Sequence, residues 1–116
     1  MKIGQQVLII KGSNAGIFAI ITGQNDDLGE AYSLEDSQGN KIWNGEFTNF
    51  PTSFLADPSK KSIQVNNRLS PSLVAAISKR AAATGLNFRQ TIESILKDVL
   101  SEELNSIKER KEVLQA

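Results

Sequence analysis

The chain contains no cysteine and no histidine among its 116 residues. Disulfides, thiolate or imidazole metal ligands, and nucleophile–base pairs built on either side chain are therefore excluded. Because histidine is the most frequent general acid–base residue, catalysis would have to rely on Asp, Glu, Lys, Ser or Tyr alone. We therefore expect a protein that is not an enzyme and that uses no metal and no other cofactor.

Long apolar runs are missing as well, since none approaches the ~20 residues that a membrane-spanning helix requires. Met1 and Lys2 lead into an alternating pattern and not into the layout of a secretory signal peptide. Hydrophobic residues make up 40% of the chain and charged residues 22%, as in folded globular proteins. The sequence thus predicts a soluble, cytoplasmic protein with no membrane partner.

Charge is balanced over the whole chain but not along it. Residues 1–59 carry three basic and seven acidic side chains, a net charge of −4, whereas residues 60–100 carry seven basic and two acidic ones, a net charge of +5. Such an asymmetry suggests that only the second segment meets a polyanion. The alternative is a chance scatter of solvated charge.

The first half has the pattern of short strands. Apolar runs at 7–10, 17–21, 31–34 and 41–43 are separated by turn-rich stretches at 12–16 and 36–40, and seven of the eight glycines lie here. We expect a small all-β barrel of about five strands over residues 1–55. Pro58 and the lysine pair that follows indicate a linker over residues 56–61.

Glycines and aliphatic residues recur at fixed spacing in this half, namely Gly4, Val7, Ile9, Gly12, Gly16, Ala19 and Ile21. The pattern resembles the KOW motif of some ribosomal proteins and transcription elongation factors, with Ala19 standing where a third glycine is expected. The resemblance implies a barrel of the Src-homology or Tudor type that binds RNA or protein. Three lysines against seven acids favour a protein partner or a dimer contact over RNA.

The pattern changes after residue 61. Residues 62–69 alternate like one strand, and Ser70 with Pro71 marks the start of a helix. Gly85 predicts the end of that helix, and Asn87 with Gln90 predicts a capping box for the next one. An apolar stripe then continues along an extended second helix, at Ile92, Ile95, Leu96, Val99, Leu100 and Leu104.

One strand and two amphipathic helices cannot be stable alone, because the strand has no partner and the helices have an apolar face left over. A second copy supplies both. We therefore predict an obligate homodimer, formed through residues 62–104, in which two strands pair antiparallel and four helices share one core.

The order of these signals, an alternating strand ending in Arg68 and Leu69, an immediate helix start, a Thr84–Gly85 turn and a second capped helix, resembles the ribbon-helix-helix family of the Arc, MetJ and CopG type. The resemblance covers about residues 61–104 and implies a ribbon-helix-helix domain over residues 62–116. Family members are homodimers that insert a two-stranded ribbon into the major groove of double-stranded DNA. The whole chain is accordingly expected to be an α+β protein.

Alternation assigns the two faces of the strand. Val65 and Leu69 point to the core, and the outward positions that read bases in the family fall on Gln64, Asn66 and Arg68. Asn67 departs from the pattern, because it occupies a core-facing position where the family usually has an aliphatic residue. A bulge or a pairing of Asn67 across the dimer axis would change which residues face the groove.

Phosphate contacts are expected from two places. The start of the second helix at Asn87, Phe88 and Arg89 offers unpaired amides to an anion, and Lys60 and Lys61 add sequence-independent attraction. Lys79 and Arg80 are either further contacts of this kind or exposed helix surface.

These inferences predict a homodimeric, sequence-specific transcription regulator of the nucleoid, whose barrel binds a partner or sets assembly. A protein-interaction scaffold or an antitoxin-like protein, using the ribbon-helix-helix only for dimerisation, is the main alternative, and an RNA-binding barrel is another. The aromatic residues of the first half are either a ligand-binding patch or the core of a very small domain.

Overall fold

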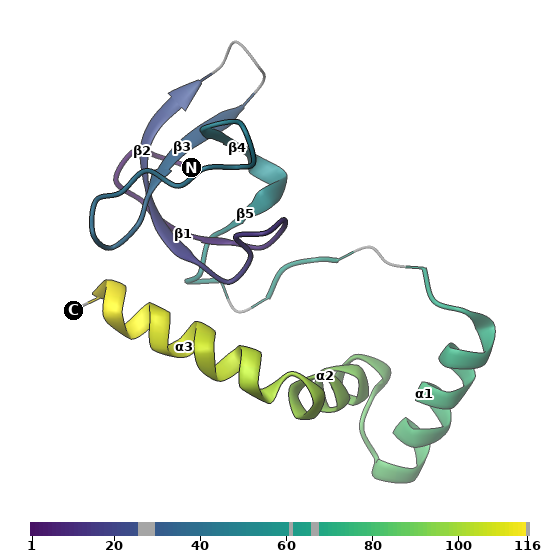
Figure 1. Ribbon diagram of the computed structural model, residues 1–116. Coiled ribbons are helices and arrows are strands. Elements are labelled where there is room, and N and C mark those ends of the chain that lie inside the picture. The colour runs from purple at the N-terminus through teal and green to yellow at the C-terminus, as the bar shows by residue number, and fades with distance from the viewer. Residues whose placement is uncertain (26–29, 61, 66–67, 116) are drawn as a thin grey trace. The chain divides into compact units, whose positions relative to one another are not determined.

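The computed structural model describes residues 1–25, 30–60, 62–65 and 68–115, with backbone only for 111–115. The chain divides into two compact units, one comprising Met1–Ile63 together with the residues from Ile107 onward, the other comprising Gln64–Ser106 (Figure 1). A five-stranded antiparallel sheet and three α-helices confirm the predicted α+β class. None of the helices within the described ranges is long and apolar enough to cross a membrane.

The sheet belongs to the first unit and has the strand order β4-β3-β2-β1-β5, with every neighbouring pair antiparallel. Its strands are β1 (Gln6–Ile9), β2 (Phe18–Asn25), β3 (Ala31–Glu35), β4 (Asn49–Pro51) and β5 (Leu55–Ala56). The predicted strands at 7–10, 17–21 and 31–34 correspond to β1, β2 and β3.

Pairs of residues directly opposite each other across the sheet build its core. Val7 lies opposite Ala19, Ile21 opposite Leu34, Tyr32 opposite Phe50 and Ile9 opposite Leu55, and all eight side chains are buried. Burial of each large apolar side chain contributes about 1.5–3 kcal/mol. The Tyr32 hydroxyl donates a hydrogen bond to the Glu30 carboxylate, so the buried ring keeps a polar partner.

The two edge strands of the sheet, β4 and β5, are neighbours along the chain. Only a 3₁₀ turn, η1 (Thr52–Phe54), separates them. Five strands in a flat sheet would set its edges roughly 19 Å apart, but the four residue steps from Pro51 to Leu55 reach at most about 14 Å. The sheet must therefore curl until its edges approach each other.

The strands of the sheet differ from the predicted ones at two places. Residues 41–43 form no strand, and Lys41 makes only an isolated bridge to Glu35. Strand β5 extends to Ala56, which was expected to start the linker. Pro51 ends β4 at an edge of the sheet, where a missing N–H donor is tolerated.

The second unit contains helices α1 (Pro71–Thr84) and α2 (Phe88–Val99), and helix α3 (Ser101–Gln115) begins in it. The predicted start and end of α1 and the predicted start of α2 are confirmed. The Ser70 side chain accepts a hydrogen bond from the Leu73 amide at 3.3 Å, and Gly85 ends α1 with φ +74°. Glycine adopts this left-handed conformation at no steric cost.

The extended second helix is interrupted. Leu100 has φ −102° and ψ 21°, outside the helical range, although its amide still bonds the Leu96 carbonyl at 2.8 Å. Ser101 then begins α3, with Glu102 and Glu103 in the first turn, where carboxylates favour the positive end of a helix dipole. The apolar stripe continues through this boundary, and for that reason the periodicity alone indicated one helix.

Candidate nucleic-acid interface

The segment that precedes α1 carries the predicted base-reading side chains. Residues 62–65 and 68–70 have no regular secondary structure and are exposed. Gln64 and Arg68 lie in this described part, whereas Asn66 and the atypical Asn67 lie outside the described residues. Among residues 62–65 and 68–69, which the structure describes, the predicted strand is not formed, and none of the described strands pairs with them.

The side chains assigned to the other face of that strand are exposed too. Val65 is 66% and Leu69 41% accessible to solvent. These are the residues that alternation places in a core. In a single chain Val65 and Leu69 are therefore not part of a core.

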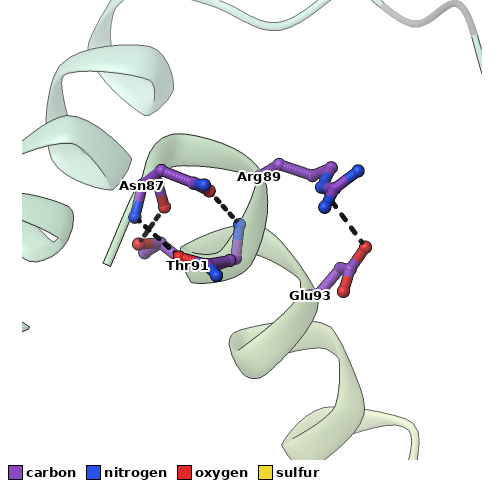
Figure 2. A network of polar contacts seen from close by, with 5 residues as sticks. Asn87, Arg89, Thr91 and Glu93 are labelled. Carbon is purple, nitrogen blue, oxygen red and sulfur yellow. Dashed lines mark hydrogen bonds and ion pairs between the residues drawn. The ribbon is translucent and has the colours of Figure 1, made fainter.

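The start of α2 is held by a reciprocal set of hydrogen bonds (Figure 2). The Asn87 side chain accepts from the Gln90 amide at 2.8 Å, and the Gln90 side chain accepts from the Asn87 amide at 3.1 Å. The Thr91 hydroxyl donates to the Asn87 carbonyl at 2.8 Å and is buried. The first helical turn is therefore rigidly defined, with Asn87 as its cap and not as a free side chain.

Phe88 and Arg89 follow the cap directly. Their amides belong to the first turn, which an α-helix cannot satisfy internally. The Arg89 guanidinium lies 3.9 Å from the Glu93 carboxylate one turn later, and both side chains are mostly exposed (Figure 2). An exposed pair of this kind stabilises by only about 0.3–0.5 kcal/mol. Arg89 can therefore exchange Glu93 for another anion at little cost.

Lys60 belongs to the first unit and follows a tight turn. The Asp57 carboxylate accepts hydrogen bonds from the hydroxyl and the amide of Ser59, at 2.7 and 2.9 Å. These bonds lower the pKa of Asp57 below its ordinary value, and desolvation opposes them; the Lys60 charge, which also lowers the pKa, contributes least. Lys61 lies outside the described residues. Lys79 and Arg80 are exposed on α1.

The helix pair leaves most of its apolar surface uncovered. Among the described residues of Gln64–Ser106, only Ile77, Ala81 and Thr91 are buried. The large apolar side chains that remain exposed are Val65, Leu69, Leu73, Val74, Leu86, Phe88, Leu96, Val99, Leu100 and Leu104. Unpartnered apolar surface of this extent is typical of an interaction face.

Sequence reasoning treated the aromatic residues of the first half as one group, and the structure separates them. Phe18, Tyr32 and Phe50 are buried, whereas Trp43 and Phe47 are exposed. The signal that could have identified the exposed pair is the dipeptide Asn44–Gly45 between them, which is typical of a tight turn.

No cluster of His, Cys, Asp or Glu suited to a metal ion occurs within the described part of the chain. Comparison with known proteins returned no matching family model, no matching curated protein and no matching solved structure.

Proposed function

We propose that the protein is a homodimeric, sequence-specific DNA-binding regulator of the ribbon-helix-helix type. In this proposal the curled sheet is a small barrel attached to the DNA-binding dimer, and the protein acts on the nucleoid in the cytoplasm. The observation that carries the proposal is the large apolar face of α1 and α2 that one chain leaves exposed.

A second copy is the simplest cover for that face. Two capped helices with three buried residues between them lack the core of an independent domain. Four helices, two from each copy, would enclose Leu73, Val74 and Leu96 from both sides. Stability would then depend on protein concentration, as in any obligate dimer.

The same two-fold axis would complete the predicted strand. Residues 62–65 and 68–69 are exposed, and this segment lies directly before the Ser70 cap. Paired antiparallel with its copy, it would bury Val65 and Leu69 and satisfy the backbone groups that an isolated strand leaves open. This would project Gln64, Asn66 and Arg68 from the opposite face.

Those outward side chains have the chemistry of base recognition. Gln and Asn pair bidentately with adenine, and Arg pairs with guanine, in a groove wide enough for a two-stranded ribbon. The start of α2 and Lys60 and Lys61 would contact phosphates. The net charge of +5 over residues 60–100 supports attraction to DNA.

Selection of bound fragments from random duplex DNA by the full-length protein tests the proposal. We expect one enriched, pseudo-palindromic sequence, because a two-fold dimer reads two equivalent half-sites. Affinity for that sequence should fall steeply as salt rises. If no sequence is enriched, and the dimer nevertheless forms, the proposal is wrong and the protein-interaction scaffold is favoured.

A further inference from the structure

Two large aromatic side chains of the first unit are not explained by its core. Trp43 is 57% and Phe47 68% exposed, although Ile42 beside them is buried and its amide bonds the Leu34 carbonyl at 2.9 Å. The backbone is therefore anchored to the sheet at the residue before Trp43. Trp43 is exposed because Ile42, the residue before it, points into the core and successive side chains of an extended backbone point to opposite sides.

The turn between the two aromatic residues is tightly hydrogen-bonded. The Asn44 amide donates to the Phe47 carbonyl at 2.7 Å, and the Phe47 amide donates back to Asn44 at 3.1 Å. Gly45 supplies the required positive φ of +64°. Residues 43–47 are named here the aromatic loop. Two reciprocal backbone hydrogen bonds between Asn44 and Phe47 close its turn, with Trp43 and Phe47 at the two ends.

Two side-chain bonds connect the aromatic loop to the rest of the unit. The Asn14 side chain donates to the Trp43 carbonyl at 2.7 Å, and the Asn44 side chain donates to the Asn49 carbonyl at 3.3 Å. A loop fixed in this way loses little conformational entropy when a ligand binds. Trp is among the residue types that most often dominate binding energy, and Phe is enriched at the cores of interfaces.

Charge indicates which partner suits this surface. Glu46 lies between the two rings in sequence, is exposed, and forms no ion pair with any described residue. The segment of the chain that contains the loop, residues 1–59, carries a net charge of −4, with Lys41 as the basic residue nearest to Trp43 in sequence. Single-stranded nucleic acid would also stack on exposed aromatic rings, but its phosphates would be repelled by this charge. A positively charged partner is attracted.

We propose that Trp43, Phe47 and Glu46 form a docking surface for a basic segment of another protein. The rings would pack on an apolar side chain of that segment, and Glu46 would pair with a neighbouring Lys or Arg. This inference is independent of DNA binding, because it uses none of the residues that we propose to contact DNA.

The experiment is a selection of random 12-residue peptides displayed on phage, using the full-length protein as bait. We expect enriched peptides to carry Lys or Arg next to a large apolar residue. The best of them, made synthetically, should shift the fluorescence of Trp43 to shorter wavelength, and this signal is specific because Trp43 is the only tryptophan in the chain. Phe47→Ala should weaken binding about tenfold or more.

Matched variants separate a specific surface from general stickiness. Glu46→Lys should weaken binding of the peptide and leave the sheet folded. Ile3→Ala, at another exposed apolar residue, should leave binding of the peptide unchanged. Trp43→Ala, measured by calorimetry, should abolish binding. Unchanged thermal unfolding of each variant shows that the loss is not one of folding.

Four results would overturn the inference. The first is an absence of enriched peptides, and the second is enrichment that survives Trp43→Ala. The third is a fluorescence shift with single-stranded DNA or RNA instead of peptide, which would assign the surface to nucleic acid. The fourth is a change of oligomeric state in Trp43→Ala, seen by sedimentation, which would assign the surface to a second copy of the chain.

Discussion

Asn87 and Gln90 bond each other's backbone amides, and Thr91 closes the same turn by donating to the Asn87 carbonyl. We expect Asn87→Ala to lower the free energy of unfolding by about 1 kcal/mol, because it removes the cap acceptor of α2. Chemical denaturation at one fixed protein concentration measures this. Asn87→Asp keeps the acceptor and should cost less than half as much, and equal losses in the two variants would contradict the capping role.

Gly85 provides a test of backbone conformation free of side-chain clashes. A Cβ at this position would meet no atom within 4 Å, but φ is +74°. Gly85→Ala should therefore destabilise the protein by about 1–2 kcal/mol through the left-handed conformation alone. Gly85→Asn should destabilise it less, because Asn tolerates this region. Thermal or chemical unfolding ranks the two, and the reverse order would exclude this explanation.

Leu73 distinguishes a dimer face from a merely exposed leucine. If a second copy covers α1, Leu73→Glu places a charge in a shared core, and we expect the dimer to dissociate at micromolar concentration. Sedimentation measures the molecular mass. Ile3→Glu is the matched control, because Ile3 is also an exposed apolar residue but lies in the other unit. A parent protein that is already a well-folded monomer would refute the dimer.

Arg68 and Lys79 separate base recognition from general attraction. Arg68→Ala should weaken binding to the selected DNA sequence by roughly 1–3 kcal/mol with little effect on random DNA, and the dimer should persist. If Lys79 contacts phosphate, Lys79→Ala should weaken binding to both DNAs equally and reduce the salt dependence of that binding. Fluorescence anisotropy with both duplexes measures each effect. An Arg68→Ala variant as specific as the parent would remove Arg68 from the groove.

Asp57 gives a prediction for pH. The bonds from Ser59 stabilise the ionised carboxylate, so the folded-state pKa is lower than that of the unfolded chain. The stability of this turn is therefore fully present above about pH 4 and is lost as pH falls through the lowered pKa. Side-chain NMR titration should give Asp57 a pKa below its ordinary value, and Ser59→Ala should raise it. A titration unaffected by Ser59→Ala would assign the shift to another cause.

Local signals were the most predictable part of this fold. Ser70, Pro71, Gly85 and the Asn87–Gln90 pair all act within one turn of helix, so their residue types determine both ends of α1 and the start of α2 without help from the rest of the chain. The break at Leu100 was missed because apolar spacing runs unchanged across it.

Features that depend on distant residues were less predictable. Strand β5 is two residues long, and Leu55 is identified as a strand residue only by its pairing with Ile9. The different exposure of Tyr32 and Trp43 depends on whether each ring faces the core of the first unit, and aromatic character does not encode this. In our proposal the base-reading strand forms only by pairing with a second copy, and the sequence of one chain does not show the contacts between two copies.

The short link between β4 and β5 also has a kinetic consequence. Because Leu55 pairs with Ile9 near the start of the chain, β1 cannot acquire its second neighbour until residues 55–56 have left the ribosome. Until then the nascent sheet would present an unpaired β1 edge, and the three residues of η1 would bring both outer strands into place almost together. Lengthening η1 with flexible residues should uncouple these two steps and slow the final closure.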